Sequence, residues 1–294
     1  MYWQTSRFQI DLSRPKVMGI VNVTPDSFSD GGQYASRDAA IAHCDQLLQD
    51  GADLLDIGGE SSRPGAPAVP VEEELARVLP VLRHAVTLGV PISVDTYKPQ
   101  VMQAALDLGA DIINDIWALR WPGDASGKTG IQVISMHPSC GICLMHMHRE
   151  PQTMQLSPMD GDVVSQVNAF LSALALQIEG LGVDSKRISL DPGIGFGKTV
   201  QQNFALLARQ SELLPLGYPL LAGWSRKSSL AAVTQNSLAA VASMDVQDRI
   251  VPSVVAALLA VQNGASIVRV HDVRQTVQAF KVFAAMQMAD QKMG

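Results

Sequence analysis

The chain repeatedly runs through a short stretch of apolar residues and then stops on a polar one, and it does so eight times. Stretches with helical spacing lie between these runs. Short apolar runs that alternate with amphipathic helices are typical of βαβ units around a parallel sheet buried on both faces. Eight such units predict an α/β chain folded as a (β/α)8 TIM barrel, with residues 1–294 in a single domain.

In such a barrel the carboxyl ends of the strands surround the active site, so each polar residue that ends a run is a catalytic candidate. These residues are Asn22, Glu60, Asp95, Asn114, His146, Asp191, Lys227 and His271. We predict strands over 16–22, 53–59, 91–95, 111–114, 142–147, 188–191, 219–227 and 267–271. The main predicted helices span 36–50, 98–109, 131–136, 162–180, 245–263 and 274–288. Residues 1–15 are expected to form a strand or hairpin that closes the bottom of the barrel.

Composition narrows the classes of partner. The net charge of −6 and the pI near 5.5 argue against nucleic acid. No apolar run is long enough to span a membrane, and the amino terminus lacks the features of a signal peptide, which predicts a cytoplasmic protein. The three cysteines form no disulfide framework. Cys140 and Cys143 lead into an apolar strand, so a structural role is favoured over a metal or redox site.

The glycine-rich segment from Asp191 to Lys198 resembles a phosphate-binding loop but lacks the spacing of a Walker motif. It also lacks the glycine offsets of the dinucleotide fingerprint. Its glycines would let the backbone turn sharply and leave Asp191 at the strand tip beside a flat ligand. A βα turn that merely needs glycines for tightness is the alternative.

Basic residues cluster at the ends of the last two strands. Ser225-Arg226-Lys227-Ser228 opens a helix and could bind an anion, although a solvated basic turn explains it equally well. Arg269 and His271 are two apart on one strand and therefore share a face. Two cations on the inner face of an apolar strand are costly unless something anionic binds there, which favours an anion site.

Asp95, Asn114 and Asp191 could each simply cap the helix that follows. Three such residues at one end of the barrel, facing Lys227, instead suit a flat heterocycle rich in hydrogen-bonding groups. Asn22 offers a neutral oxygen suitable for Mg²⁺, the cation that accompanies polyphosphates.

Two loops, 23–34 and 61–70, are unusually long and rich in Gly, Pro and Ser. They bury little apolar surface, so we expect them to open easily in the free protein and to close over bound ligands.

Eight motifs occur in order and in register with the predicted strands: MGIVNVTPDSFSDGG, DIGGESSRPGA, SVDTYKP, INDI, CLMHM, DPGIGFGKT, AGWSRKS and VRVHDV. Together they resemble the bacterial dihydropteroate synthases over essentially the whole chain. The resemblance implies a folate-pathway transferase that joins 6-hydroxymethyl-7,8-dihydropterin diphosphate to 4-aminobenzoate and releases diphosphate. It also implies small-molecule substrates, Mg²⁺ and a homodimer.

The resemblance further implies roles for individual residues. Pterin contacts would come from Asp95, Asn114, Met145, Asp191, Phe196 and Lys227. Asn22, Arg269 and His271 would hold Mg²⁺-diphosphate, with Asn22 as the metal ligand. The aminobenzoate would lie among Phe28, Ser62, Arg63, Pro64 and Ser228. The residues closest to the chemistry would be Asp95, Lys227, Arg269 and His271.

Two positions depart from the family pattern. Ser62 stands where the family commonly has Thr, and His148-Arg149 stands where Gln-Gly often follows the fifth strand. Two other functions were weighed. Corrinoid methyltransferases share the barrel but need no diphosphate site, so the basic strand ends count against them. A non-catalytic paralogue is disfavoured by the intact TPDSFSDGG and ESSRPG loops.

Overall fold

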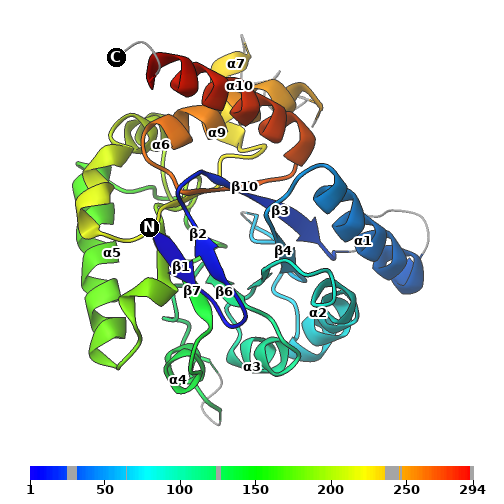
Figure 1. Ribbon diagram of the computed structural model, residues 1–294. Helices are drawn as coiled ribbons and strands as arrows, with labels where there is room; N and C mark the ends of the chain where they lie inside the picture. Colours follow the sequence, from blue (N-terminus) through cyan, green and yellow to red (C-terminus); the bar gives the residue numbers. More distant parts are fainter. Residues whose placement is uncertain (25–31, 64, 124–126, 236–244, 246, 292–294) are drawn as a thin grey trace.

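The computed structural model describes residues 1–24, 32–63, 65–123, 127–235, 245 and 247–291. Its centre is one sheet of eight parallel strands, which Figure 1 shows ringed by helices. In chain order these strands are β3 (Lys16–Asn22), β4 (Leu54–Gly58), β5 (Ile92–Asp95), β6 (Ile112–Asp115), β7 (Gly141–Met145), β8 (Ile188–Asp191), β9 (Leu221–Ala222) and β10 (Ile267–Val270). β3 pairs with both β4 and β10, and a bridge between Leu190 and Leu220 joins β8 to the β9 side. The predicted (β/α)8 barrel is therefore confirmed.

Helices follow the strands around the outside. They are α1 (Gly32–Gln49), α2 (Val71–Ala85), α3 (Pro99–Asp107), α4 (Gly130–Met136), α5 (Val163–Gly180), α6 (Val200–Ala208), α7 (Ser228–Thr234), α9 (Ile250–Gln262) and α10 (Val273–Gln291). Short 3₁₀ turns are η2 (Ser185–Arg187), η3 (Gln210–Leu216) and η4 (Gln247–Arg249). Side-chain caps start several helices, as where Thr129 and Gln132 form a capping box on α4.

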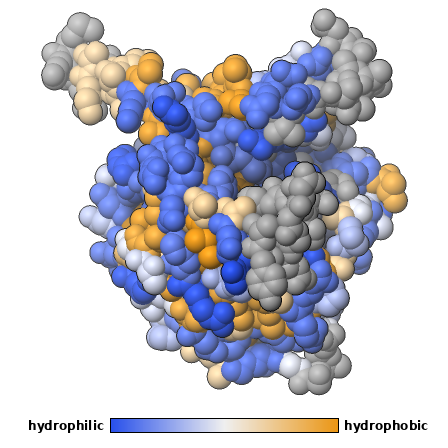
Figure 2. Space-filling model, turned by 90° about the vertical axis from the view of Figure 1, so that its right-hand side faces the viewer, coloured by the Kyte–Doolittle hydropathy of each residue, from blue (hydrophilic) through white to orange (hydrophobic). Residues whose placement is uncertain are grey.

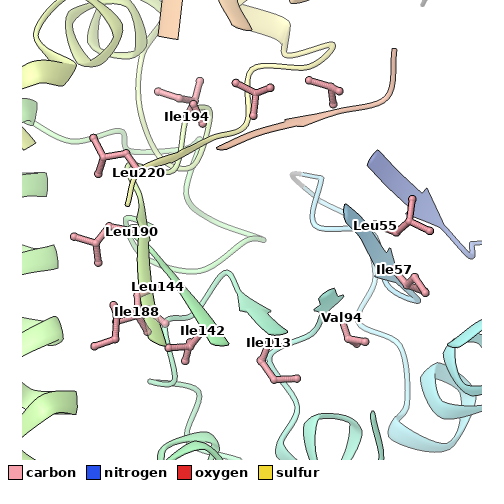
Figure 3. Packing of buried hydrophobic residues seen from close by; sticks show 14 of the residues in the cluster. Leu55, Ile57, Val94, Ile113, Ile142, Leu144, Ile188, Leu190, Ile194 and Leu220 are labelled. Carbon is pink, nitrogen blue, oxygen red and sulfur yellow. The ribbon is translucent and has the colours of Figure 1, made fainter. Parts of the chain in front are cut away.

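The main apolar core lies between the barrel and its helices. Figure 3 shows Val94, Ile113, Ile142 and Ile188 on consecutive strands of this layer. These side chains alternate with inward-pointing ones along each strand, so the barrel is lined by a separate set of residues. The outer surface over α1 and α2 is mainly hydrophilic, with the apolar residues in small groups (Figure 2). No helix in the described ranges has the length and hydropathy needed to cross a membrane.

The amino-terminal hairpin pairs β1 (Tyr2–Gln4) with β2 (Gln9–Asp11) and lies across the amino end of the barrel, in front in Figure 1. Trp3 and Ile10 point inward from the two strands, and the Trp3 indole donates to the carbonyl of Arg187 at 2.9 Å. They pack on the lowest inward-facing layer, made of Met18, Leu54, Ile112, Cys143, Leu221 and Ile267. The hairpin thus seals one end and leaves the chemistry to the other.

Several predicted boundaries need correction. Helix α1 begins at Gly32 rather than near Ser36, because Gln33, Tyr34 and Ala35 all tolerate helical backbone. The strand predicted over 219–227 is only Leu221–Ala222 long, since the chain turns at once: the Lys227 N–H donates to the Trp224 carbonyl, and Arg226 has φ of 58°.

Two further segments differ from the prediction. The helix predicted from residue 245 begins at Ile250, behind the short turn η4. The fifth predicted strand, 142–147, ends at Met145 because His146 and Met147 bend towards the glycine loop: His146 N–H donates to the Asp191 carbonyl.

Candidate active site

Strand register brings the inward-facing polar residues together at the carboxyl end. Asp95 on β5 is the register partner of Asn114 on β6, and Met145 on β7 is the partner of Asp191 on β8. Paired residues on neighbouring strands point to the same face. Gly58 lies between Asn22 and Asp95 in the register of β3, β4 and β5, and it places no side chain between them.

Arg269 is held between two carboxylates across the barrel. Its Nε lies 2.5 Å from Asp56 Oδ2, and its Nη2 lies 2.7 Å from Asp95 Oδ2. Asn114 Nδ2 also donates to Asp56 Oδ2, at 3.2 Å. Burial would lower the pKa of Arg269, but these carboxylates outweigh it and raise the pKa, so the guanidinium stays charged. Burial raises the pKa of Asp95, and Arg269 opposes that shift.

This pairing corrects the argument that Arg269 needs an external anion, because its charge already has two internal partners. Asp56 was missed from the sequence. A carboxylate inside the apolar run Leu54–Gly58 was the available signal, since a fully buried strand rarely carries one without a partner. Its second oxygen, Oδ1, has no hydrogen-bond partner within the described part of the chain, although it is buried.

The glycine loop turns sharply after Asp191, as both interpretations of the sequence expected, and its backbone holds the Asp191 carboxylate. The Gly193 N–H donates to Asp191 Oδ1 at 2.7 Å, which orients the carboxylate and leaves Oδ2 on the side of Gly223. Gly193 has φ of 68°, and a Cβ there would meet the His146 carbonyl oxygen at 1.8 Å. Only glycine fits this approach. Burial raises the pKa of Asp191, and the Gly193 N–H and Lys227 offset part of the rise.

Lys198 was also missed, although it ends the glycine motif. Its buried ammonium lies 2.9 Å from His146 Nδ1, 2.8 Å from the Gly193 carbonyl and 3.2 Å from the Phe196 carbonyl. Burial lowers the pKa of His146 to about 2, so its ring is neutral and Nδ1 can accept from Lys198. The lysine therefore ties the glycine loop to the end of β7.

Lys227 and Phe196 contact each other near Asp191. The Lys227 ammonium lies 4.3 Å from the centre of the Phe196 ring, within cation–π distance. Burial lowers the pKa of Lys227 to about 8, while Asp191 opposes that shift. Phe196 packs with Ile116, Met145 and Met147 in a small apolar cluster beside these charges. A planar ring could lie against this cluster with its polar edge towards Asp191.

His271 lies at an electropositive corner but is not a cation. Ser225 Oγ accepts the backbone N–H of His271 at 3.1 Å and lies 2.9 Å from its Nδ1, so the hydroxyl donates to Nδ1 in the tautomer whose ring hydrogen is on Nε2. Burial holds the pKa of His271 well below its ordinary value, helped by the charges of Arg226, Arg269, Arg63 and Lys227. The prediction of two cations on this strand is wrong: one is a neutral donor. Arg226 in turn pairs with Asp272, at 2.7 Å.

The remaining predicted residues lie at the rim. Ser62 and Asn22 are half-buried, whereas Arg63 and Ser228 are exposed. Phe28 and Pro64 lie outside the described residues, as does most of the predicted lid 23–34. A cavity of about 790 Å³ opens between the loop 61–70 and the ends of β5 to β7. It includes Ser62 and Asp95 but not Asp191 or Lys227, so it adjoins the polar pocket without containing it.

The residues at the mouth suit a metal bound mainly by its substrate. No cluster of three or more His, Cys, Asp or Glu side chains within the described ranges could cage an ion. Asn22 can supply one amide oxygen from the end of β3, where its register partner on β4 is Gly58. Mg²⁺ commonly takes few protein ligands and fills its other positions with water and phosphate oxygens, which fits this arrangement.

The cysteines play no part here. Cys140 and Cys143 are buried around the start of β7, and burial raises the pKa of both thiols. Neither is a reactive thiolate, which agrees with the structural role expected for the pair.

Comparison with known proteins identifies the family. Residues 18–271 match the family described as pterin binding enzyme. The dihydropteroate synthase of Neisseria meningitidis serogroup B is 48% identical, over 97% of this chain and 97% of that protein. The Burkholderia cenocepacia dihydropteroate synthase complexed with 7,8-dihydropteroate has a TM-score of 0.85 at 47% identity, covering 99% of this chain and 98% of that one. The Xanthomonas albilineans dihydropteroate synthase with 4-aminobenzoic acid has a TM-score of 0.84 at 47% identity, covering 95% of each chain. The chain therefore belongs to the pterin-binding enzymes and, among them, to the dihydropteroate synthases.

Proposed function

We propose that the barrel mouth condenses 6-hydroxymethyl-7,8-dihydropterin diphosphate with 4-aminobenzoate to give 7,8-dihydropteroate and diphosphate. The observation that carries this proposal is the buried Asp191 carboxylate. One of its oxygens is fixed by Gly193, and the other lies on the side of Gly223. The ligands named for the Burkholderia and Xanthomonas relatives, a pterin product and an aminobenzoate, support the same reaction.

The pterin lies with its polar edge towards β8. Asp191 accepts from the 2-amino group and a ring N–H, and Asn114 and Asp95 complete the edge. Lys227 donates to the ring carbonyl, while Met145 and Phe196 cover the ring faces. Recognition of this kind is selective, because a ligand without matching donors would leave buried acceptors unpaired.

The diphosphate lies towards β10 and β3. His271 donates from Nε2 without carrying a charge of its own, and Arg269 adds a fixed positive charge held by Asp56 and Asp95. Asn22 contributes an oxygen to Mg²⁺, which when bound offsets the charge of the leaving diphosphate.

The chemistry needs no nucleophile from the protein. The C–O bond from the pterin methylene to diphosphate breaks, and the aminobenzoate nitrogen forms the new C–N bond and loses a proton. Residues of the chain orient the two reactants and keep water from the electron-poor methylene. Ser62, Arg63, Pro64, Phe28 and Ser228 surround the aminobenzoate at the rim.

Two properties accompany the proposal. The protein forms a homodimer through the apolar outer residues of α9 and α10. It works in the cytoplasm, which its three unpaired cysteines support.

Asp191→Asn tests the site. The Asn oxygen can still accept from Gly193, but its amide would point a donor at the pterin's donors, at a cost of about 1–3 kcal/mol or more, roughly 5- to 150-fold in affinity. Calorimetric titration with a pterin should show this loss while the melting temperature changes little. Asp162→Asn, at the exposed start of α5, is the matched control. Undiminished pterin binding by Asp191→Asn would overturn the assignment.

A further inference from the structure

Glu60 lies just before the loop 61–70, and its side chain bonds to a residue near the other end of the loop. Glu60 Oε2 accepts from the Val69 N–H at 3.3 Å, so one carboxylate links the residue before the loop to Val69 near its end. The same oxygen accepts from the ammonium of Lys98, and Oε1 accepts from the Tyr97 hydroxyl at 2.9 Å. The Glu60 carboxylate thereby joins the loop 61–70 to the turn between β5 and α3.

Lys98 is shared between two carboxylates and is almost fully buried, at 3% exposed. Its ammonium bonds Glu60 from the loop and Glu74 from α2. Burial raises the pKa of Glu74, and Lys98 opposes that rise. The lysine therefore has one partner that belongs to the rigid helix and one that belongs to the loop.

The backbone before Glu60 is held just as closely. Gly59 packs against α2 so tightly that a Cβ there would lie 2.8 Å from Val78 Cγ2 and 3.0 Å from Glu74 Cγ. Arg77 on the same helix donates to the Gly59 carbonyl at 2.8 Å. Residues 61–68 contribute no member to the three apolar clusters of the described chain. The loop thus depends on its ends for its position.

We propose that Glu60 is a positioning residue: with Lys98, Tyr97 and the Val69 N–H it fixes both ends of the loop 61–70 over the site. The inference rests on the proposed function: the anchored loop determines where Ser62 and Arg63 contact the aminobenzoate. It leaves the pterin and diphosphate residues untouched, because those lie on β3, β5 to β8 and β10 and in the turns after β8 and β9.

The test compares Glu60→Gln with Glu74→Gln. Both remove one negative charge from the same lysine, but only the Glu60 side chain bonds to the loop; Glu74 reaches it through its backbone N–H alone, which the substitution keeps. In Glu60→Gln we expect amide hydrogen exchange of residues 61–68 to rise at least fivefold. The KM for 4-aminobenzoate should rise at least fivefold, and the Kd for the pterin diphosphate should stay within twofold. In Glu74→Gln the loop exchange and the aminobenzoate KM should stay within twofold of the parent.

Tyr97→Phe removes a single hydrogen bond of the network and should give a smaller change in the same direction, which keeps the test available if Glu60→Gln folds poorly. Loop exchange that is unchanged in Glu60→Gln, or raised equally in Glu74→Gln, would overturn the proposal. Faster loop exchange with an unchanged aminobenzoate KM would support the anchoring by Glu60 and reject the aminobenzoate contacts assigned to Ser62 and Arg63.

Discussion

Arg269 on β10 and His271, just after the end of that strand, offer an anion different groups. Arg269 brings a permanent charge that Asp56 and Asp95 already share, so a bound diphosphate competes with them for its donors. His271 brings a neutral N–H with no charge to desolvate. The site therefore combines Arg269, a cation held by two carboxylates, with His271, a neutral donor. The hydrogen bond of His271 can be redirected to an anion at little cost in free energy.

Lys227 makes pterin binding depend on pH. The pKa of Lys227 is lowered to about 8 in the free protein, so the ammonium is present below pH 8 and is lost as the pH rises through that value. If the ammonium donates to the pterin carbonyl, calorimetric affinity for a pterin without diphosphate should fall above pH 8, by up to about tenfold per pH unit.

Lys227→Arg supplies the control, because its guanidinium stays charged throughout this range. The alkaline fall should vanish in the variant. A fall that persists unchanged would assign the titration to another group.

For single residues, the sequence predicted where a side chain lies better than it predicted the charge state of that side chain. Asp95, Asn114 and Asp191 could be placed because the end of a strand is visible in the pattern of apolar residues. Asp56 carried only the signal of a carboxylate inside an apolar run, and its partners Arg269 and Asn114 are distant in the chain. The neutral state of His271 depends on burial and on charges from three places in the chain, at Arg63, Arg226–Lys227 and Arg269, and no local pattern encodes that.

The glycine loop behaves as one element because Lys198 fastens it. Lys198→Met would leave the carbonyls of Gly193 and Phe196 and the ring of His146 without their buried donor, costing about 1–3 kcal/mol or more in the free energy of unfolding. Denaturant unfolding should show this loss. Pterin affinity should fall as well, because Phe196 and Asp191 lie on the loop.

Lys186→Met is the matched control. Lys186 is exposed in η2, at the opposite end of β8, so the same substitution there should change neither quantity appreciably. Equal effects at the two positions would show that the loop does not depend on the Lys198 ammonium.

The sequence predicted the bounds of some strands better than those of others. The bounds of β3 and β8 agree with the prediction because a polar residue ends each apolar run. The short β9 does not, since its apolar run continues through Gly223 and Trp224 while the backbone already turns. Trp224 is buried against Phe204 instead, and that contact joins segments twenty residues apart.

For the whole molecule, we expect the exposed apolar residues of α9 and α10 to form the surface of the proposed dimer. Val251, Val255 and Leu259 are 71%, 49% and 40% exposed and follow one another at four-residue spacing on α9. Val282 and Met286 repeat that spacing on α10. Val255→Glu should convert a dimer into monomers in sedimentation experiments, because a charge in such an interface would be desolvated.

Leu176→Glu on α5, an equally apolar and exposed position, should leave the assembly unchanged. If neither variant changes the sedimentation coefficient of a dimeric parent, the interface lies on another surface.

The pairing of β3 with both β4 and β10 has a consequence for how the protein is made. A ribosome releases β3 first and β10 last, so one edge of β3 stays open until residue 270 has left the exit tunnel. The hairpin waits as well, since Trp3 docks on a carbonyl 184 residues later in the chain. The barrel can therefore close only after synthesis is nearly complete, and a chain stopped before β10 would display the open edge of β3 to the chaperones of the cell.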